Sequence, residues 1–148
     1  MKTKIHYFII TAFILFGCQS KTIKDNPVSL ETKTQTEHNY EEVSDYELFW
    51  ESIFDVSETN YYVYFYSSTC SHCEELKNYV IEKALNRGDI YFVKGTSKDQ
   101  ITNDQNKAIN AGNPGDIWIL GYPTLLKITN HKSSKNLVGI NQIKAELK

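Results

Sequence analysis

The chain has 148 residues, of which 41% are hydrophobic and 13% are aromatic, so it suits one domain with a packed core. Its formal net charge of −2 excludes a nucleic-acid binder that depends on a strongly basic surface. The chain has three cysteines. In an exported protein, an odd number leaves one cysteine without a disulfide partner in the same chain.

The N-terminus, residues 1–18, has the pattern of an export leader. Lys2 and Lys4 provide a positive start, and an apolar run of about ten residues follows over 7–16. That run is too short for a transmembrane helix, which needs roughly 20 residues. It ends in Leu15-Phe16-Gly17-Cys18, which resembles the lipobox of bacterial lipoproteins. We therefore expect lipid on Cys18. An uncleaved anchor and a plain signal peptide remain alternatives, and either would also export the domain.

Residues 19–43 are polar and charged, and they show no hydrophobic period, which predicts a flexible tether. A flexible chain of this length has a typical end-to-end span of roughly 25–30 Å. With lipid on Cys18, the protein is expected in the cell envelope, anchored to the membrane on its extracytoplasmic side.

An ordered domain is predicted over residues 44–148. Ser44-Asp45-Tyr46-Glu47 has the capping-box pattern of a helix start, and apolar residues follow it at helical spacing over 49–54. The aromatic and β-branched run over 61–66 indicates a central strand. Cys70 stands where the next helix begins, and Asn86-Arg87-Gly88 predicts the end of that helix.

The second half of the domain alternates in the same way. Residues 90–93 indicate a strand and 102–111 a weaker helix, and Asn113-Pro114-Gly115-Asp116 is a turn signal. Two more strands are predicted over 124–129 and 135–138, with a loop over 130–134 between them. A closing helix is predicted over 141–148. The order of elements predicts a small α/β domain of about 105 residues, with a central mixed sheet flanked by helices.

Cys70-Ser71-His72-Cys73 places a C-x-x-C pair at the start of a predicted helix. The free amides and the positive end of the helix dipole stabilise a thiolate there, so Cys70 is expected to be the nucleophile and Cys73 the resolving cysteine. If Cys18 carries lipid, these two can pair only with each other. A static structural disulfide remains an alternative. A metal site is not expected, because zinc needs four ligands and the chain has no second C-x-x-C.

Two segments of the domain resemble the thioredoxin family. One is YFYSSTCSHCEELK, which runs from a strand into the active-site helix, and the other is GYPTLLKI, which resembles the family's cis-proline loop and the strand after it. The resemblance implies a thioredoxin-like fold and thiol–disulfide exchange with protein substrates, with no cofactor. It also implies that Pro123 is cis and lies beside the cysteines, and that the backbone of Tyr122 pairs with the substrate. A monomer is expected.

Two residues bear on the direction of exchange. An imidazole at His72 can hydrogen-bond to the Cys70 thiolate or add positive charge near it, and both effects make the disulfide a better oxidant. The oxidase and isomerase branches of the family also carry histidine at this place. Tyr64 stands where thioredoxin has a buried aspartate, and a phenol with a pKa near 10 is a poor base at neutral pH. Glu74 or Glu75 would then accept the proton, unless both simply favour the helix dipole.

These features favour an extracytoplasmic oxidase or isomerase. One alternative is a membrane-tethered reductase, which would need electrons from a membrane redox partner. Another is a non-catalytic accessory lipoprotein whose disulfide is structural.

Overall fold

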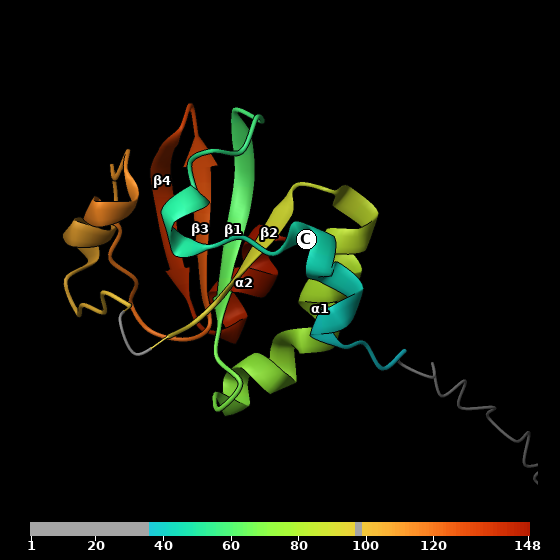
Figure 1. Cartoon of the computed structure of the whole chain (residues 1–148). Coiled ribbons are helices and arrows are strands. Elements are labelled where there is room, and N and C mark those ends of the chain that lie inside the picture. The colour runs from blue at the N-terminus through green and yellow to red at the C-terminus, as the bar shows by residue number, and fades with distance from the viewer. Residues whose placement is uncertain (1–35, 97–98) are drawn as a thin grey trace, which may run out of the picture. The chain divides into compact units, whose positions relative to one another are not determined.

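The computed structural model describes residues 36–96 and 99–148, which belong to one compact unit, Thr34–Lys148. Its four strands form one mixed sheet in the order β2-β1-β3-β4 (Figure 1). The strands are β1 (Asn60–Tyr66), β2 (Ile90–Lys94), β3 (Thr124–Thr129) and β4 (Lys132–Val138). β1 and β2 are parallel, and the other neighbours are antiparallel.

Helices flank this sheet, so the predicted α/β class with a mixed sheet is confirmed. The α-helices are α1 (Ser71–Arg87) and α2 (Ile140–Glu146). Short 3₁₀ helices among the described residues are η1 (Tyr40–Tyr46), η2 (Trp50–Ser52), η3 (Gln105–Ala108) and η4 (Pro114–Asp116). No described helix is long and apolar enough to cross a membrane. The predicted leader, Cys18 and residues 19–35 of the predicted tether lie outside the described residues.

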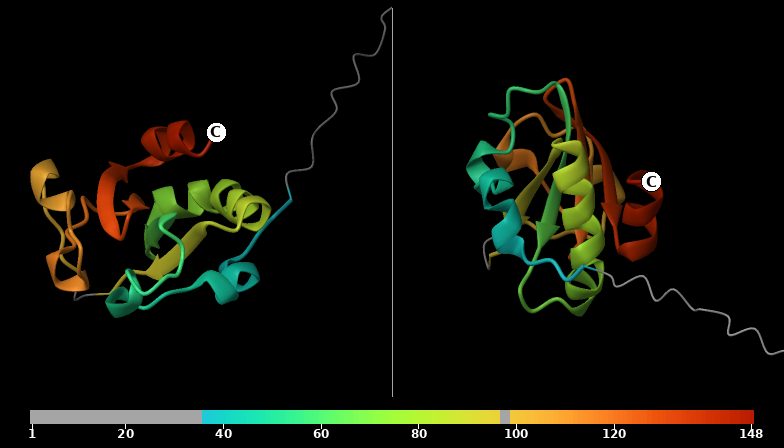
Figure 2. Two further views of the ribbon diagram at one scale, coloured as in Figure 1. Left: turned by 90° about the horizontal axis from the view of Figure 1, so that it is seen from above. Right: turned by 90° about the vertical axis from the view of Figure 1, so that its right-hand side faces the viewer.

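β1 lies inside the sheet and is buried on both faces, as its unbroken apolar run predicts. Because successive side chains of a strand point to opposite faces, its tyrosines at 62, 64 and 66 pack with α1 and α2. The residues at 61, 63 and 65 pack against the other face. Figure 2 shows that α1 and α2 share one face of the sheet. In the described part of the chain, the opposite face is covered by the segments around η2 and η4, without an α-helix.

α1 forms as its sequence predicts. Leu76, Val80 and Ala84 recur every four residues on one side of the helix, and all three are fully buried. Gly88 ends the helix with a φ of 74°, a left-handed conformation that glycine adopts without steric cost, and its amide donates to the Ala84 carbonyl. This helix therefore holds its first residues firmly against the end of β1.

The helix predicted from Ser44 is wrong in position and length. The capping box is formed by Asn39 and Glu42, which begin η1, and Ser44 lies inside that element. The chain then becomes extended, because the Leu48 amide donates to the Phe92 carbonyl of β2 at 2.7 Å. Only the single turn of η2 follows, and Phe49 is left 81% exposed.

The predicted boundary between tether and domain at residues 43/44 also needs correction. Val43, the last residue assigned to the tether, is buried against α1 and the sheet. Tyr40 stacks on Tyr66 of β1, with ring centroids 3.8 Å apart. The ordered part of the chain therefore begins before Ser44.

The helix predicted over 102–111 is reduced to η3. Backbone pairing explains the difference, because the Thr102 amide donates to the Ile119 carbonyl and the Ile119 amide to the Gln100 carbonyl, both at 2.9 Å. Asn110, with a φ of 71°, stops any continuation as a helix. The predicted turn at 113–116 is confirmed as η4.

The last two strands form a tighter hairpin than predicted. β4 begins at Lys132, not at residue 135, so the predicted loop over 130–134 shrinks to Asn130 and His131. Both have positive φ, 51° and 56°, as a two-residue turn with the twist of a hairpin requires.

Candidate active site

Cys70 and Cys73 lie where β1 passes into α1. Three residues separate the strand from Cys70, which is the N-cap of the helix, and its sulfur accepts a hydrogen bond from the Cys73 amide at 3.2 Å. The two cysteines form a disulfide with their Cα atoms 5.2 Å apart. Cys70 is half-buried, whereas Cys73 is only 1% exposed. The outer sulfur can therefore be attacked, and the inner one is shielded.

The start of α1 favours negative charge on the outer sulfur. A reduced Cys70 would lie at the positive end of a 17-residue helix, with the Cys73 amide directed at its sulfur. Both effects stabilise a thiolate over a thiol, and the thiolate is the nucleophile in disulfide exchange. The predicted placement of the pair at a helix start is thus confirmed.

His72 lies in the first turn of α1, and its side chain is exposed. Among the described residues, its ring takes part in no hydrogen bond or ion pair. The geometry therefore leaves the ring free to turn toward Cys70, but its effect on the redox potential stays a prediction.

Pro123 lies at the same end of the sheet as the cysteines. The Tyr122–Pro123 peptide bond is cis, as the resemblance implies. Thr124, the next residue, pairs with Phe65 near the end of β1, which places Pro123 at the same end of the sheet as Cys70. The loop is fixed by two hydrogen bonds, from the Thr124 hydroxyl to the Gly121 carbonyl at 2.7 Å and from the Gly139 amide to the Pro123 carbonyl at 3.0 Å.

The backbone of Tyr122 is available for pairing. Within the described residues, neither its N–H nor its C=O takes part in a backbone hydrogen bond. Its side chain packs beside the same hydrophobic cluster as Cys70. Sequence reasoning placed Tyr122 in the site through its backbone, and the structure adds a role for its ring, which covers Gly95 at the end of β2.

Tyr64, which stands in place of an acid, is fully buried. Burial raises its pKa well above the usual value of 10, so the phenol stays neutral. Its hydroxyl faces that of Tyr40, and within the described structure neither hydroxyl has a hydrogen-bond partner. Burial likewise raises the pKa of Tyr40, to about 12. Sequence reasoning missed Tyr40, because its neighbours along the chain show no hydrophobic period.

A small pocket of about 240 Å³ lies over Cys73 and is called the cysteine pocket below. Glu74 lines it and forms an ion pair with Lys77 at 2.5 Å. Glu75 is exposed and is not among the lining residues. Of the two glutamates considered for proton transfer, Glu74 is the one that shares the cysteine pocket with Cys73.

The comparisons with known proteins add only distant likenesses. No family model matches the sequence, and a search of curated proteins finds no match. Among solved structures, Chlamydomonas reinhardtii thioredoxin f2 is similar with 17% identity and a TM-score of 0.43, over 68% of this chain and 88% of that one. Oxidised thioredoxin from Plasmodium falciparum shows 18% identity and a TM-score of 0.44, over 66% and 86%. Saccharomyces cerevisiae mitochondrial thioredoxin 3 shows 15% identity and a TM-score of 0.43, over 68% of this chain and 88% of that one.

Because these scores are low, the fold is assigned from the chain's own topology. A parallel β1–α1–β2 unit is followed by an antiparallel β3–β4 pair and a final helix, with a cysteine pair at the start of α1 and a cis-proline before β3. The fold is thioredoxin-like. Within the described part of this thioredoxin-like chain, no cluster of three His, Cys, Asp or Glu side chains could hold a metal ion.

Proposed function

We propose that the chain is a membrane-anchored, extracytoplasmic thiol–disulfide oxidoreductase acting on protein thiols and disulfides. Its preferred reaction is the oxidation or isomerisation of the substrate. The observation that carries the proposal is the cysteine pair itself. The half-buried Cys70 caps α1, the buried Cys73 donates its amide to the Cys70 sulfur, and the cis-proline loop lies at the same end of the sheet.

In the oxidising direction, a substrate thiolate attacks the Cys70 sulfur. The Cys70–Cys73 bond breaks, a mixed disulfide forms between substrate and Cys70, and Cys73 leaves as a thiolate that takes up a proton. A second substrate thiolate then attacks the substrate sulfur of the mixed disulfide and releases Cys70 as a thiolate. The substrate loses two electrons and two protons, and the cysteine pair gains the two electrons. Reduction of a substrate is the same sequence reversed.

Three features support the roles assigned around this exchange. Stabilisation of the Cys70 thiolate by the helix start makes it a good leaving group in the oxidising direction. The Tyr122 backbone, unpaired in the described structure, suits pairing with an extended substrate strand. Tyr64 keeps its proton at neutral pH, so it does not serve as the base that a fast reductase would need at Cys73.

A redox titration of the Cys70–Cys73 pair against glutathione tests the proposed direction. A midpoint between about −120 and −180 mV is the expected result, because oxidases and isomerases lie in this range. A midpoint near about −270 mV would favour a reductase instead, which would draw electrons from a membrane redox partner.

The membrane anchor rests on Cys18. Cys18→Ala should release the protein from the membrane fraction or stop its maturation, and the unaltered chain should stay in that fraction. An equal distribution of both proteins would contradict lipidation of Cys18, although it would leave the exchange chemistry untouched.

A further inference from the structure

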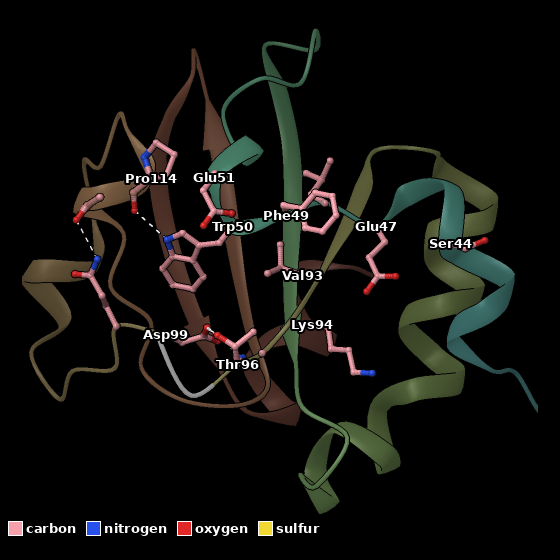
Figure 3. A pocket seen from close by; sticks show the side chains of 14 residues that line it. Ser44, Glu47, Phe49, Trp50, Glu51, Val93, Lys94, Thr96, Asp99 and Pro114 are labelled. Atoms are coloured by element: carbon pink, nitrogen blue, oxygen red, sulfur yellow. Dashed lines mark hydrogen bonds between the residues drawn. The ribbon is translucent and has the colours of Figure 1, made fainter.

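The face of the sheet without an α-helix holds a pocket of about 1030 Å³, called the sheet-face pocket below (Figure 3). Val93 of β2 lines it, Phe49 and Trp50 lie on one side, and Pro114 and Gly115 belong to the turn at η4. Pockets that bind small molecules commonly measure roughly 300–1,000 Å³, so this one can accommodate several side chains of a polypeptide.

The walls of this pocket are fixed by hydrogen bonds. The Trp50 indole donates to the Pro114 carbonyl at 3.0 Å, and the Gln100 amide donates to the Gly115 carbonyl at 3.1 Å. Trp50 also packs edge-on against Phe65, with ring centroids 5.3 Å apart. These contacts hold the walls of the pocket in place, which lowers the entropy cost of binding.

The sheet-face pocket and the cysteine pocket share one lining residue. Lys94 lines both this pocket and the cysteine pocket, which contains Cys73. The next residue, Gly95, also lines the pocket, and the Tyr122 ring lies so close to it that a Cβ at Gly95 would overlap the Tyr122 hydroxyl. That hydroxyl donates to the carboxylate of Asp99, another lining residue. Two residues of the pocket lining therefore contact the cis-proline loop through the Tyr122 side chain.

The charges and the apolar surface of the pocket indicate its occupant. Its lining includes the acidic residues Glu47, Glu51 and Asp99, against the single described lysine, Lys94. Phe49 is the most exposed large apolar side chain in the described structure, at 81%. An aromatic wall beside excess negative charge suits a ligand that carries a large apolar side chain and a lysine or arginine.

We infer that the sheet-face pocket binds the polypeptide substrate, accepting a segment that carries apolar and basic side chains while the substrate cysteine reacts at Cys70. The inference rests on the proposed function and names the class of substrate. Tyr122 is the link, because it precedes Pro123 in the cis-proline loop and its side chain contacts two residues of the pocket lining, Gly95 and Asp99.

Two dithiol peptides test the inference with the full-length oxidised protein. Both carry the same cysteine pair, but one has phenylalanine and lysine beside it and the other has serine and glutamate. Each peptide reduces the Cys70–Cys73 disulfide and is itself oxidised, and free protein thiols are counted by alkylation and mass measurement. The protein should be half-saturated by the phenylalanine–lysine peptide at a concentration about fivefold or more below that of the serine–glutamate peptide.

Phe49→Ala should raise the half-saturating concentration of the phenylalanine–lysine peptide about fivefold. Its rate with dithiothreitol should not change, because a small dithiol needs only the cysteine pair. The side chain is mostly exposed, so the thermal midpoint should stay the same. Leu85→Ala is the matched control, because Leu85 is a 44% exposed apolar residue on α1, away from the pocket lining, and neither peptide should respond to it.

Glu51→Lys tests the charge of the pocket separately. It should raise the half-saturating concentration of the phenylalanine–lysine peptide and lower that of the serine–glutamate peptide. If both variants leave both peptides unaffected while the parent protein still oxidises them, the inference is wrong and the proposed function stands. If Phe49→Ala instead alters only self-association in sedimentation, a second copy occupies the pocket, which also overturns the inference. A parent protein inert even to dithiothreitol would remove the proposed function itself.

Discussion

Cys70 and Cys73 are three residues apart, yet their surroundings differ sharply. The sequence predicted this difference, because a C-x-x-C at a helix start exposes its first sulfur and turns its second inward. It also predicted the cis peptide bond before Pro123, whereas the role of Pro123 in substrate binding stays a prediction. It could not predict Tyr40, whose contact with Tyr66 joins residues far apart along the chain, with rings stacked at 3.8 Å.

His72 is the residue through which the direction of exchange can be tested. His72→Pro removes the imidazole that would stabilise the Cys70 thiolate, and the thiolate belongs to the reduced state. The midpoint of the cysteine pair should therefore fall by about 30 mV or more, which corresponds to about 1.4 kcal/mol for a two-electron couple.

The measurement is a glutathione titration of both proteins, followed by alkylation of free thiols. His72→Ala serves as the control for the backbone effect of proline, and it should shift the midpoint in the same direction. Unchanged midpoints in both variants would show that His72 is only an exposed surface residue.

At the scale of elements, strong local patterns predicted correctly and weak ones did not. β1 matches the sequence because it is a continuous aromatic and β-branched run, and α1 because its apolar residues recur at helical spacing. The helices predicted from Ser44 and over 102–111 fail, because backbone pairing of Leu48 with Phe92 and of Thr102 with Ile119 outweighs a weak helical preference. Such long-range pairing is not encoded in the local pattern.

The β3–β4 turn offers a test at this scale. His131 has a φ of 56°, in the left-handed region that costs a residue with a Cβ about 1 kcal/mol or more. His131→Gly should therefore raise the free energy of unfolding by about 0.5–1 kcal/mol, measured by urea denaturation. His131→Ala keeps the Cβ and should give no gain. A loss of stability with glycine would contradict the turn geometry.

For the whole molecule, the topology gathers the site from distant parts of the chain. The end of β1, the start of α1, the end of β2 and the loop before β3 meet at one end of the sheet, carrying Cys70, Gly95 and Pro123. Through two motifs, the sequence predicted a cysteine pair at the start of a helix and a cis-proline, and both are present. It did not predict the sheet-face pocket, because that pocket exists only where short turns, not helices, cover the second face.

Glu146, near the end of the chain, forms ion pairs with Lys127 of β3 and Lys135 of β4. These contacts are expected to make the free energy of unfolding depend on pH. Burial opposes its ionisation, but hydrogen bonds from Lys135, Lys127 and Tyr62 outweigh this and lower its pKa from 4.5. A lowered folded-state pKa stabilises the fold above the unfolded pKa, and the contribution is lost as the pH falls through the folded value.

Glu146→Gln should therefore cost about 1 kcal/mol or less at pH 7, because the lysine partners are 34% and 48% exposed and solvent screens them. The difference from the parent protein should shrink as the pH falls below the ordinary glutamate pKa of 4.5 and through the lowered folded-state pKa, in a series of urea denaturations. Glu82→Gln, at an exposed position of α1 without an ion pair in the described structure, should show no such trend. A cost that is constant across the series would rule out an ionic origin.

The most direct measurement of the exchange chemistry is trapping with Cys73→Ser in cells that produce the full-length protein. Without the resolving sulfur, a mixed disulfide between Cys70 and a protein partner cannot be released by Cys73. The account predicts that Cys73→Ser accumulates higher-mass species that thiol reduction dissolves, and that Cys70→Ser with Cys73→Ser accumulates none. If Cys73→Ser traps no partner and the disulfide of the unaltered protein also resists dithiothreitol, the disulfide is structural and the proposed function is wrong.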